Sequence, residues 1–571
     1  MNKIDKPQTF TRSPFLSDAE LTLADVLSLL SDDVTLSPTR RRDLCSAIRR
    51  LGKLLNRDLA MVPARMTAFH HEINNLHHLD VGVSLKSVRN IKSDVIAAFR
   101  HLGISQTTKD TERQLSEVWK DLYESLEDKR LLYGLSRFIR YCNSAGIKPV
   151  DVDDEVVTCF MKAVHEGTFV KNEDKLHRQV VRLWNEAADT ISGWPEQTLC
   201  VPPTKVKRTS LPMTTFPASF RDEMETYLVW LEGKDIFAEH QPPKRCKPGT
   251  IRQRRSYIQL AASVLVHQGT DIDRINSLQA LVEPEALKSI ARFYIDRNEG
   301  TVTSFLRCLC NALLQMAKFY LLLDTVRIDA IQEIRRRLGT ELPGLTEKNR
   351  AMLRQFDDPK VLGRFLALPE DLVEDAIKED NSNWRVTVKV QVALAIEILL
   401  MAPMRIKNLC GLRLDQHIIR SGGHNGTVHI VLMDHETKNE VPAEYELPRH
   451  LVELLDLYLK DFRPRLAAPD NPYLFPGKDV DQKAPGTFRP VIQSTIYKRS
   501  GVIISPHQFR HLAAKLILDA NPANYELTRR VLHHRNIKTT INYYAGLDAK
   551  RAVRHYDETI LKLREELNNG E

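Results

Sequence analysis

Hydrophobic residues recur at helical spacing along most of the chain. The segment LSPTRRRDLCSAIRRLGKLL, within residues 19–104, begins with a Ser/Thr helix-start signal and then alternates apolar residues with arginines. Residues 112–198 and 216–340 have the same periodicity. The most apolar stretch, Val390 to Met404, is too short to span a bilayer and is expected to form a buried helix. These patterns predict a mainly α-helical protein.

A short β region interrupts the helical pattern in the C-terminal part. The segment TVHIVLM (427–433) is rich in β-branched residues, and the polar turn DHETKNE follows it. The next segment, VPAEYELP (441–448), is typical of a returning strand. The predicted fold class is therefore mainly α, with a small β-sheet in the C-terminal domain.

Changes in composition divide the chain into several predicted parts. The stretch LCVPPTKVKRTSLPMTTFP combines proline, threonine and lysine with few large apolar residues, which indicates a linker. The predicted parts are a flexible lead-in (1–18), a helical N-terminal domain (19–110), a second helical domain (111–198), a linker (199–215), a third helical domain (216–342) and a C-terminal domain (343–571).

The composition is that of an ordinary globular protein with a slight excess of positive charge. The 571 residues carry a formal net charge of +8, which permits a nucleic-acid partner without proving one. The eight cysteines are scattered and form no C-x-x-C pair, so we expect reduced thiols. The first residues lack the apolar core of a signal peptide. We therefore expect a cytoplasmic protein.

Two arginines, a lysine, two histidines and a tyrosine stand in four short segments near the C-terminus. They are Arg405 in APMRIKNLCGLRL, Lys438 in the polar turn, His507 and Arg510 in ISPHQFRHLAAKLIL, and His534 and Tyr543 in VLHHRNIKTTINYY. Guanidinium groups clamp phosphate oxygens, imidazoles carry protons near neutrality, and a phenol can form a covalent ester. The set suits cleavage of a phosphodiester without a metal. Taken singly, each residue is also common in a solvated or packed position.

The order and flanks of these segments resemble the tyrosine recombinase, or phage integrase, family. ETKNE between two strands and YLFPG (473–477) are further landmarks of the resemblance, which covers residues 343–571. The resemblance implies that Arg405 and Arg510 grip the scissile phosphate, His507 and His534 contact it and help with protons, Lys438 is the general acid toward the leaving 5′ oxygen, Tyr543 forms a 3′-phosphotyrosine, and His511 supports the site.

Three positions depart from the family pattern. His533 stands where the family has a glycine, and Asn408 stands where an acidic residue is frequent. A second tyrosine, Tyr544, follows Tyr543 directly. The family spacing favours His534 over His533 and Tyr543 over Tyr544.

The resemblance also implies DNA as the partner and assembly on it. The third helical domain is the candidate for clamping the duplex, through basic residues that would contact phosphates or grooves. These residues are Lys244, Arg245, Lys247, Arg252, Arg254 and Arg255. We expect a homo-tetramer on DNA, with a dimer at each recombination site. Accessory proteins are also possible partners, and we expect no membrane partner.

No cofactor and no metal are expected. The histidine-rich segment FHHEINNLHH (69–78) lacks the H-E-x-x-H spacing, so it is expected to be a solvated helix face. The function expected from these features is a nucleoid-associated, site-specific recombinase of the integrase or transposase type that integrates or excises a mobile element. The alternatives are a type IB topoisomerase-like enzyme and a non-catalytic DNA-binding protein of the same fold.

Overall fold

The chain divides into two compact units. One is formed by residues 203–343, and the other by residues 1–202 together with 344–571. The computed structural model of the chain describes residues 20–104, 114–203, 209–234, 237, 240–340, 344–379, 383–422, 426–547 and 549–568. The predicted lead-in (1–18) lies outside the described residues.

The unit formed by residues 203–343 is helical. Its helices are α9 (Ala218–Trp230), α10 (Pro248–His267), α11 (Pro284–Arg297), α12 (Ser304–Phe319) and α13 (Thr325–Arg337). Thr303 and Asp324 cap α12 and α13 by accepting backbone N–H groups with their side chains. The inward faces of the five helices enclose a hydrophobic core of their own, so this unit has the packing that an independent domain requires.

The other unit begins with two groups of helices, each packed around its own core. The first group contains α1 (Leu23–Asp32), α2 (Pro38–Leu55), α3 (His70–Asn75) and α4 (Leu85–His101). The second contains α5 (Glu117–Glu124), α6 (Lys129–Ser144), α7 (Asp154–Gly167) and α8 (Glu173–Thr190). The helix-start signal predicted in the first group is real, because Ser37 Oγ accepts the backbone N–H of Arg40 at 3.3 Å.

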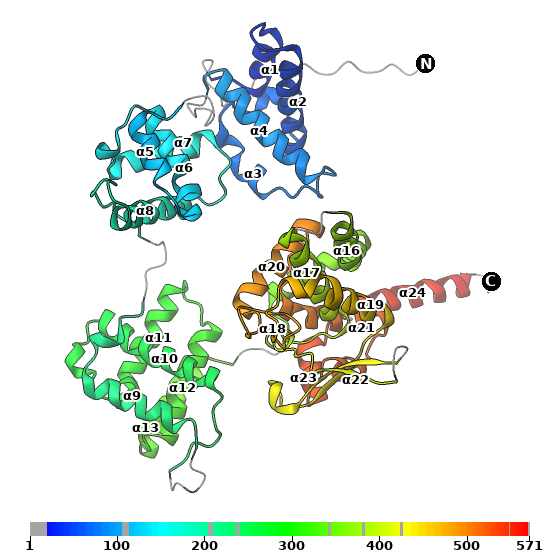
Figure 1. Ribbon diagram of the computed structural model, residues 1–571. Helices are drawn as coiled ribbons and strands as arrows, with labels where there is room; N and C mark the ends of the chain where they lie inside the picture. The colour runs from blue at the N-terminus through cyan, green and yellow to red at the C-terminus, as the bar shows by residue number, and fades with distance from the viewer. Residues whose placement is uncertain are drawn as a thin grey trace. The chain divides into compact units, whose positions relative to one another are not determined.

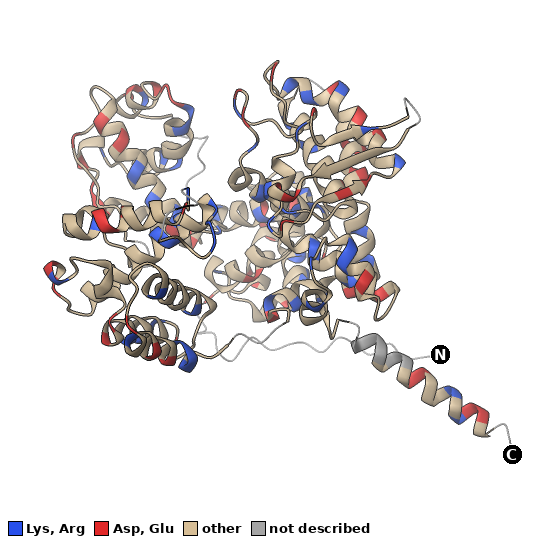
Figure 2. Cartoon of the chain, turned by 90° about the horizontal axis from the view of Figure 1, so that it is seen from below, with Lys and Arg blue, Asp and Glu red and all other residues tan. Residues whose placement is uncertain are grey.

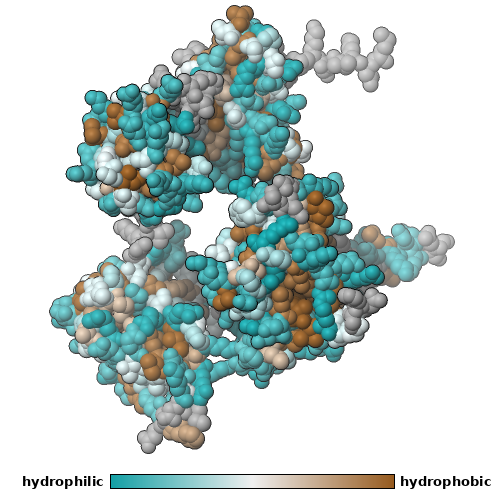
Figure 3. All heavy atoms as spheres, in the orientation of Figure 1, coloured by the Kyte–Doolittle hydropathy of each residue, from teal (hydrophilic) through white to brown (hydrophobic). Residues whose placement is uncertain are grey.

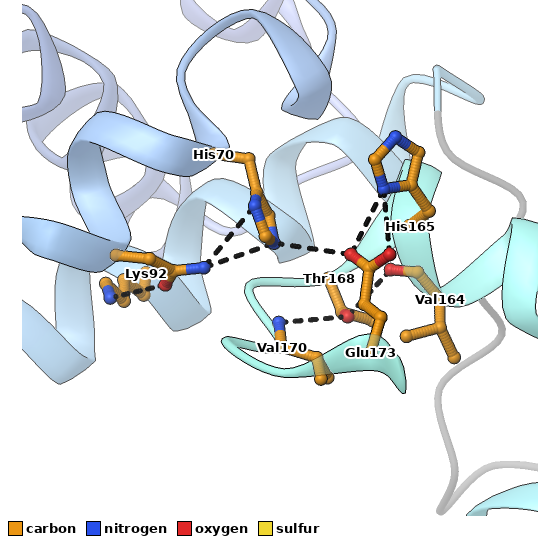
Figure 4. A network of polar contacts seen from close by, with 8 residues as sticks. His70, Lys92, Val164, His165, Thr168, Val170 and Glu173 are labelled. Carbon is orange, nitrogen blue, oxygen red and sulfur yellow. Dashed lines mark hydrogen bonds and ion pairs between the residues drawn. The ribbon is translucent and has the colours of Figure 1, made fainter. Parts of the chain in front are cut away.

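Polar side chains of α3, α4, α7 and α8 form the network in Figure 4. His70 Nε2 lies 3.8 Å from Glu173 Oε1, and His165 Nδ1 lies 3.1 Å from the same oxygen. Lys92 Nζ donates to Asn74 Oδ1 at 3.1 Å. Burial lowers the pKa of His70, although Glu173 opposes the shift. The expectation that the histidine-rich segment is a solvated helix face is therefore wrong at His70, whose ring faces a neighbouring helix.

The C-terminal part, from residue 344 onward, is mostly helical with one small sheet (Figure 1). Its helices before the sheet are α14 (Glu347–Arg354), α15 (Pro359–Leu366), α16 (Leu368–Lys378), α17 (Trp384–Met401) and α18 (Ile406–Cys410). Those after it are α19 (Arg449–Leu457), α20 (Pro485–Ser500), α21 (Phe509–Ala520), α22 (Tyr525–Val531), α23 (Ile537–Tyr544) and α24 (Ala549–Asn568).

Helix α17 runs through the centre of this part and packs against α16, α19, α20 and α21. Nearly every side chain from Val390 to Leu399 is buried, which confirms the predicted buried helix. Its buried polar residue Gln391 accepts from Lys483 Nζ at 2.5 Å and donates to the hydroxyl of Tyr458 at 3.0 Å. Because the amide has partners on both sides, its burial carries little penalty.

The sheet is antiparallel, with strand order β1–β2–β3. Strands β2 (Val428–Leu432) and β3 (Ala443–Glu446) confirm the two predicted strands, and alternate residues of each face the core. Strand β1 (Ile418–Arg420) was not predicted. The mainly α fold with a small C-terminal sheet is confirmed.

On the face seen in Figure 3, hydrophilic residues predominate and hydrophobic residues form scattered groups. Along the ribbon, basic and acidic residues are interspersed (Figure 2). Within the residues that the structure describes, no helix combines the length and apolar character needed to cross a membrane.

Candidate active site

Two arginines from distant segments meet at the C-terminal end of α17. Arg405 follows the Ala402–Met404 segment and caps α18, and its Nη2 donates to Asn439 Oδ1 at 3.3 Å. Arg510, in the first turn of α21, is only 6% exposed. Its Nη1 donates to the carbonyl of Pro403 at 2.7 Å, and its Nη2 donates to the carbonyl of Leu532. Arg510 therefore joins the segment that presents Arg405 to the segment that precedes His534.

A chain of hydrogen bonds orients His511, which is buried beside Arg510. Gln508 accepts the backbone N–H of Ser505 with its oxygen, so its amide nitrogen donates to Asn349 Oδ1 at 3.0 Å. Asn349 must then donate its own nitrogen to His511 Nε2, at 3.4 Å. The proton of His511 consequently sits on Nδ1 and is donated to the hydroxyl of Tyr544 at 3.1 Å.

His534 and His533 stand side by side but have different surroundings. His534 Nδ1 contacts Thr540 Oγ1 at 2.9 Å, which leaves Nε2 as the nitrogen available to a ligand. The ring of His534 stacks on that of Tyr544 with centroids 6.3 Å apart. His533 has a φ of 48°, in the left-handed region where glycine is the usual residue, and its ring packs edge-on against Tyr445. The backbone at 533 thus has the conformation that the family's glycine would suit.

Lys438 lies in the turn that joins β2 to β3 and is exposed. The side chain of the preceding residue, Thr437, closes the turn. Its Oγ1 lies 3.0 Å from the carbonyl oxygen of Asp434 and 2.9 Å from that of Val441, and it accepts the N–H of Val441 at 3.1 Å. The following residue is Asn439, which accepts from Arg405. Both neighbours of Lys438 are therefore held in place.

The two tyrosines at the end of α23 have opposite environments. Tyr543 is 48% exposed, whereas Tyr544 is 3% exposed and belongs to the hydrophobic core. Burial raises the pKa of Tyr544 to about 12, although the charge of Arg510 acts against the shift. A phenol that is buried, hydrogen bonded to His511 and hard to ionise is a poor nucleophile. Of the two phenols, that of Tyr543 is therefore the accessible one.

All six predicted catalytic residues line a single cavity of about 360 Å³. Its lining is Gly344, Leu345, Thr346, Asn349, Arg405, Lys438, Asn439, His507, Arg510, His511, His534, Thr539, Tyr543 and Tyr544. These described residues include two arginines and a lysine and no Asp or Glu. Because a carboxylate that would neutralise the arginines is missing from this lining, the cavity is suited to an anion such as phosphate.

Burial and neighbouring charges hold the histidines of the cavity in their neutral form. Desolvation lowers the pKa of both His511 and His534 to about 4, and the charge of Arg510 adds to the effect. The pKa of His507 is also lowered, first by desolvation and then by the charges of Arg510 and Arg405. At neutral pH these imidazoles are therefore uncharged, and an uncharged imidazole with a free ring nitrogen can accept a proton, as a general base does.

Sequence reasoning missed several residues of the cavity. Among them are Asn439 and Asn349, which hold Arg405 and His511. Asn439 could have been suspected from its position next to Lys438. Asn349 could not, because it lies 162 residues from His511 in the chain and has no motif around it.

The six predicted DNA-binding residues lie in and just before α10. Lys244, Arg245, Lys247 and Arg252 are exposed, and Arg254 and Arg255 are partly buried. Arg255 is bonded to Glu225 of α9 through both terminal nitrogens, with Nη2 and Oε2 2.6 Å apart. Its charge is therefore neutralised within the protein, unlike that of Arg252. Among the described residues, no group of three or more His, Cys, Asp or Glu side chains is arranged to hold a metal ion.

Comparison with known proteins supports the interpretation of the C-terminal part. Residues 367–551 match the phage integrase family. A stretch of 59 residues is 42% identical to tyrosine recombinase XerC of Pseudomonas aeruginosa. That stretch is 10% of this chain and 14% of the relative's length.

Solved structures of recombinases also resemble the chain, at low identity. The XerH recombinase bound to its palindromic difH substrate is 15% identical, with a TM-score of 0.37 over 61% of this chain and 99% of that one. The Tn1549 transposon integrase bound to transposon right end DNA is 17% identical, with a TM-score of 0.34 over 55% of this chain and 95% of that one. The sequence similarity to the phage integrase family therefore concerns residues 367–551 of the chain.

Proposed function

We propose that the protein is a site-specific recombinase that cuts and rejoins double-stranded DNA through a 3′-phosphotyrosine intermediate. The observation that carries the proposal is the convergence of the six side chains on one cavity whose described lining holds three cations and no carboxylate. The similarity of residues 367–551 to the phage integrase family supports the same chemistry.

In the proposed reaction, the Tyr543 oxygen attacks the scissile phosphorus and the bond from phosphorus to the 5′ oxygen breaks. A neutral imidazole of the cavity accepts the phenol proton, and Lys438 gives a proton to the leaving 5′ oxygen. Reversal with a 5′ hydroxyl from another strand reseals the DNA and frees the tyrosine. The bond energy is kept in the phosphotyrosine, so no nucleotide cofactor is consumed.

Arg405 and Arg510 would stabilise the charge that grows on the phosphate oxygens in the transition state. Arg510 is already held by two backbone carbonyls and Arg405 by Asn439, so little side-chain motion is lost when phosphate binds. Desolvation strengthens the effect, because both guanidiniums are screened from water.

DNA contacts outside the cavity would come from the unit that contains α10, through its exposed lysines and arginines. Assembly would use α24, whose apolar side chains are exposed. Those residues are Val553, Tyr556, Leu561, Leu563 and Leu567. We propose that this helix packs on a neighbouring protomer in a tetramer on DNA. The biological role would be the integration or excision of a mobile element in the nucleoid, with accessory proteins where the site requires them.

The function is tested by recombination between two copies of the DNA site taken from the ends of the element that encodes the protein. Wild type is expected to exchange strands, and Arg510→Ala and Tyr543→Phe are expected to abolish exchange. Relaxation of supercoiled plasmid without site preference or exchange would instead identify a topoisomerase. Specific DNA binding without either reaction would identify a non-catalytic DNA-binding protein.

A further inference from the structure

A buried histidine beside the sheet anchors the turn that carries Lys438. His417 directly precedes β1 and is 5% exposed. Its backbone carbonyl accepts the N–H of Val431 in β2 at 2.9 Å, which extends the pairing of β1 with β2. The backbone of His417 is therefore paired with the strand that leads into the turn, 21 residues before Lys438 in the sequence.

The contacts of the ring determine where its proton lies. The backbone N–H of Arg413 donates to His417 Nδ1 at 2.8 Å, so Nδ1 is an acceptor and carries no proton. The proton of the neutral ring is then on Nε2, which lies 2.8 Å from Glu436 Oε1. His417 consequently donates to Glu436, and this direction does not depend on the ring becoming charged.

Glu436 connects His417 to the turn. Its second oxygen, Oε2, accepts the N–H of Met433 at 2.8 Å, at the first residue after β2. Burial alone would raise the pKa of Glu436, but the hydrogen bonds from Met433 and His417 outweigh it and the pKa is lowered. The carboxylate therefore stays ionised and bridges β1 to the turn. Glu436 stands two residues before Lys438.

After Lys438, the N–H of Val441 donates to Thr437 Oγ1, and Asn439 accepts from Arg405. We infer that His417, acting through Glu436, is a positioning residue that holds Lys438 toward the leaving 5′ oxygen. The inference rests on the proposed function of Lys438. The step concerned breaks the bond from phosphorus to the 5′ oxygen, and the proton moves from Lys438 Nζ to that oxygen.

The test compares two suicide substrates that differ in one atom. One has the ordinary 5′ oxygen at the scissile position, and the other has a bridging sulfur there. A thiol has a pKa of about 8.5, so a thiolate leaves without the proton that an alkoxide needs. A variant that has lost only the general acid is therefore slow on oxygen and normal on sulfur.

The variant is His417→Phe, which keeps a ring of similar size and removes both hydrogen bonds. Its control is His450→Phe, because His450 makes an equally short contact of 2.8 Å with a different carboxylate, Glu397, and this pair joins α19 to α17 outside the turn. Lys438→Ala reports loss of the acid itself. Single-turnover formation of the covalent complex is measured for each protein on both substrates.

We expect His417→Phe to cleave the oxygen substrate about 10- to 100-fold more slowly than wild type, since proton transfer contributes about 10²- to 10⁴-fold. On the sulfur substrate it should lie within about 3-fold of wild type, as Lys438→Ala should, with His450→Phe normal on both. Equal slowing of His417→Phe on both substrates, or no slowing on either, would overturn the inference. If sulfur fails to rescue Lys438→Ala, the proposed role of Lys438 fails first.

Discussion

Replacing Tyr544 by phenylalanine removes one hydroxyl that the His511 Nδ1 proton needs as its acceptor. Both groups are buried, at 3% and 8% exposure, and the substitution leaves the Nδ1 proton without its protein acceptor. A buried donor left without a partner costs about 1–3 kcal/mol. For a domain of this size each kcal/mol lowers the unfolding temperature by about 2–4 °C. The expected decrease is therefore roughly 2–12 °C.

The measurement is differential scanning calorimetry of the full chain, with Tyr543→Phe as the matched control. Tyr543 is half exposed, so its variant should unfold within about 1 °C of wild type. Tyr544→Phe should keep its ability to form the covalent complex, because its hydroxyl is assigned no chemical role. An unfolding temperature for Tyr544→Phe equal to that of Tyr543→Phe would refute the hydrogen-bond chain that orients His511.

Three further predictions follow from charge and burial. The pKa of His511 is about 4 in the folded protein and 6.5 in the unfolded chain. The free energy of unfolding is therefore up to about 3 kcal/mol higher above pH 6.5 than at low pH, and this difference is lost as the pH falls toward 4. The unfolding temperature of His511→Gln should depend less on pH over that range, and a pH dependence equal to that of wild type would contradict this. Arg252→Ala should weaken DNA binding and reduce the slope of log affinity against log salt by about 1, whereas Arg255→Ala, already paired with Glu225, should change the slope far less; equal changes would argue against the pairing. Arg405→Lys should slow single-turnover cleavage about 10²- to 10³-fold, and a decrease under about 5-fold would remove Arg405 from the phosphate clamp.

The helical character and the two longer strands could be predicted because each is encoded in a local pattern. The alternating residues of 428–432 and the apolar run of α17 carry their own signal. Strand β1 has only three residues, Ile418–Arg420, and its pairing with β2 depends on a segment ten residues away. So short a strand gives no periodicity to detect.

The candidate site was also predictable only where a local motif marks its residues. Spacing in a motif selected Tyr543 over Tyr544, but the physical difference between them, exposure against burial, follows from the packing of α23 on the rest of the domain. The pairing of Arg255 with Glu225 joins residues 30 positions apart on two helices, so the basic cluster looked uniform in the sequence. The hydrogen bond from His417 to Glu436 could not be predicted either, because the two residues are 19 positions apart in the sequence.

The central claim is that Tyr543 forms a covalent bond with DNA. The most direct measurement is trapping on a nicked suicide substrate carrying the DNA site from the ends of the encoding element, followed by a denaturing gel with wild type, Tyr543→Phe and Tyr544→Phe side by side. The proposal predicts a covalent protein–DNA band for wild type and Tyr544→Phe that is absent for Tyr543→Phe. A band that persists in Tyr543→Phe, or one that disappears only in Tyr544→Phe, would contradict it.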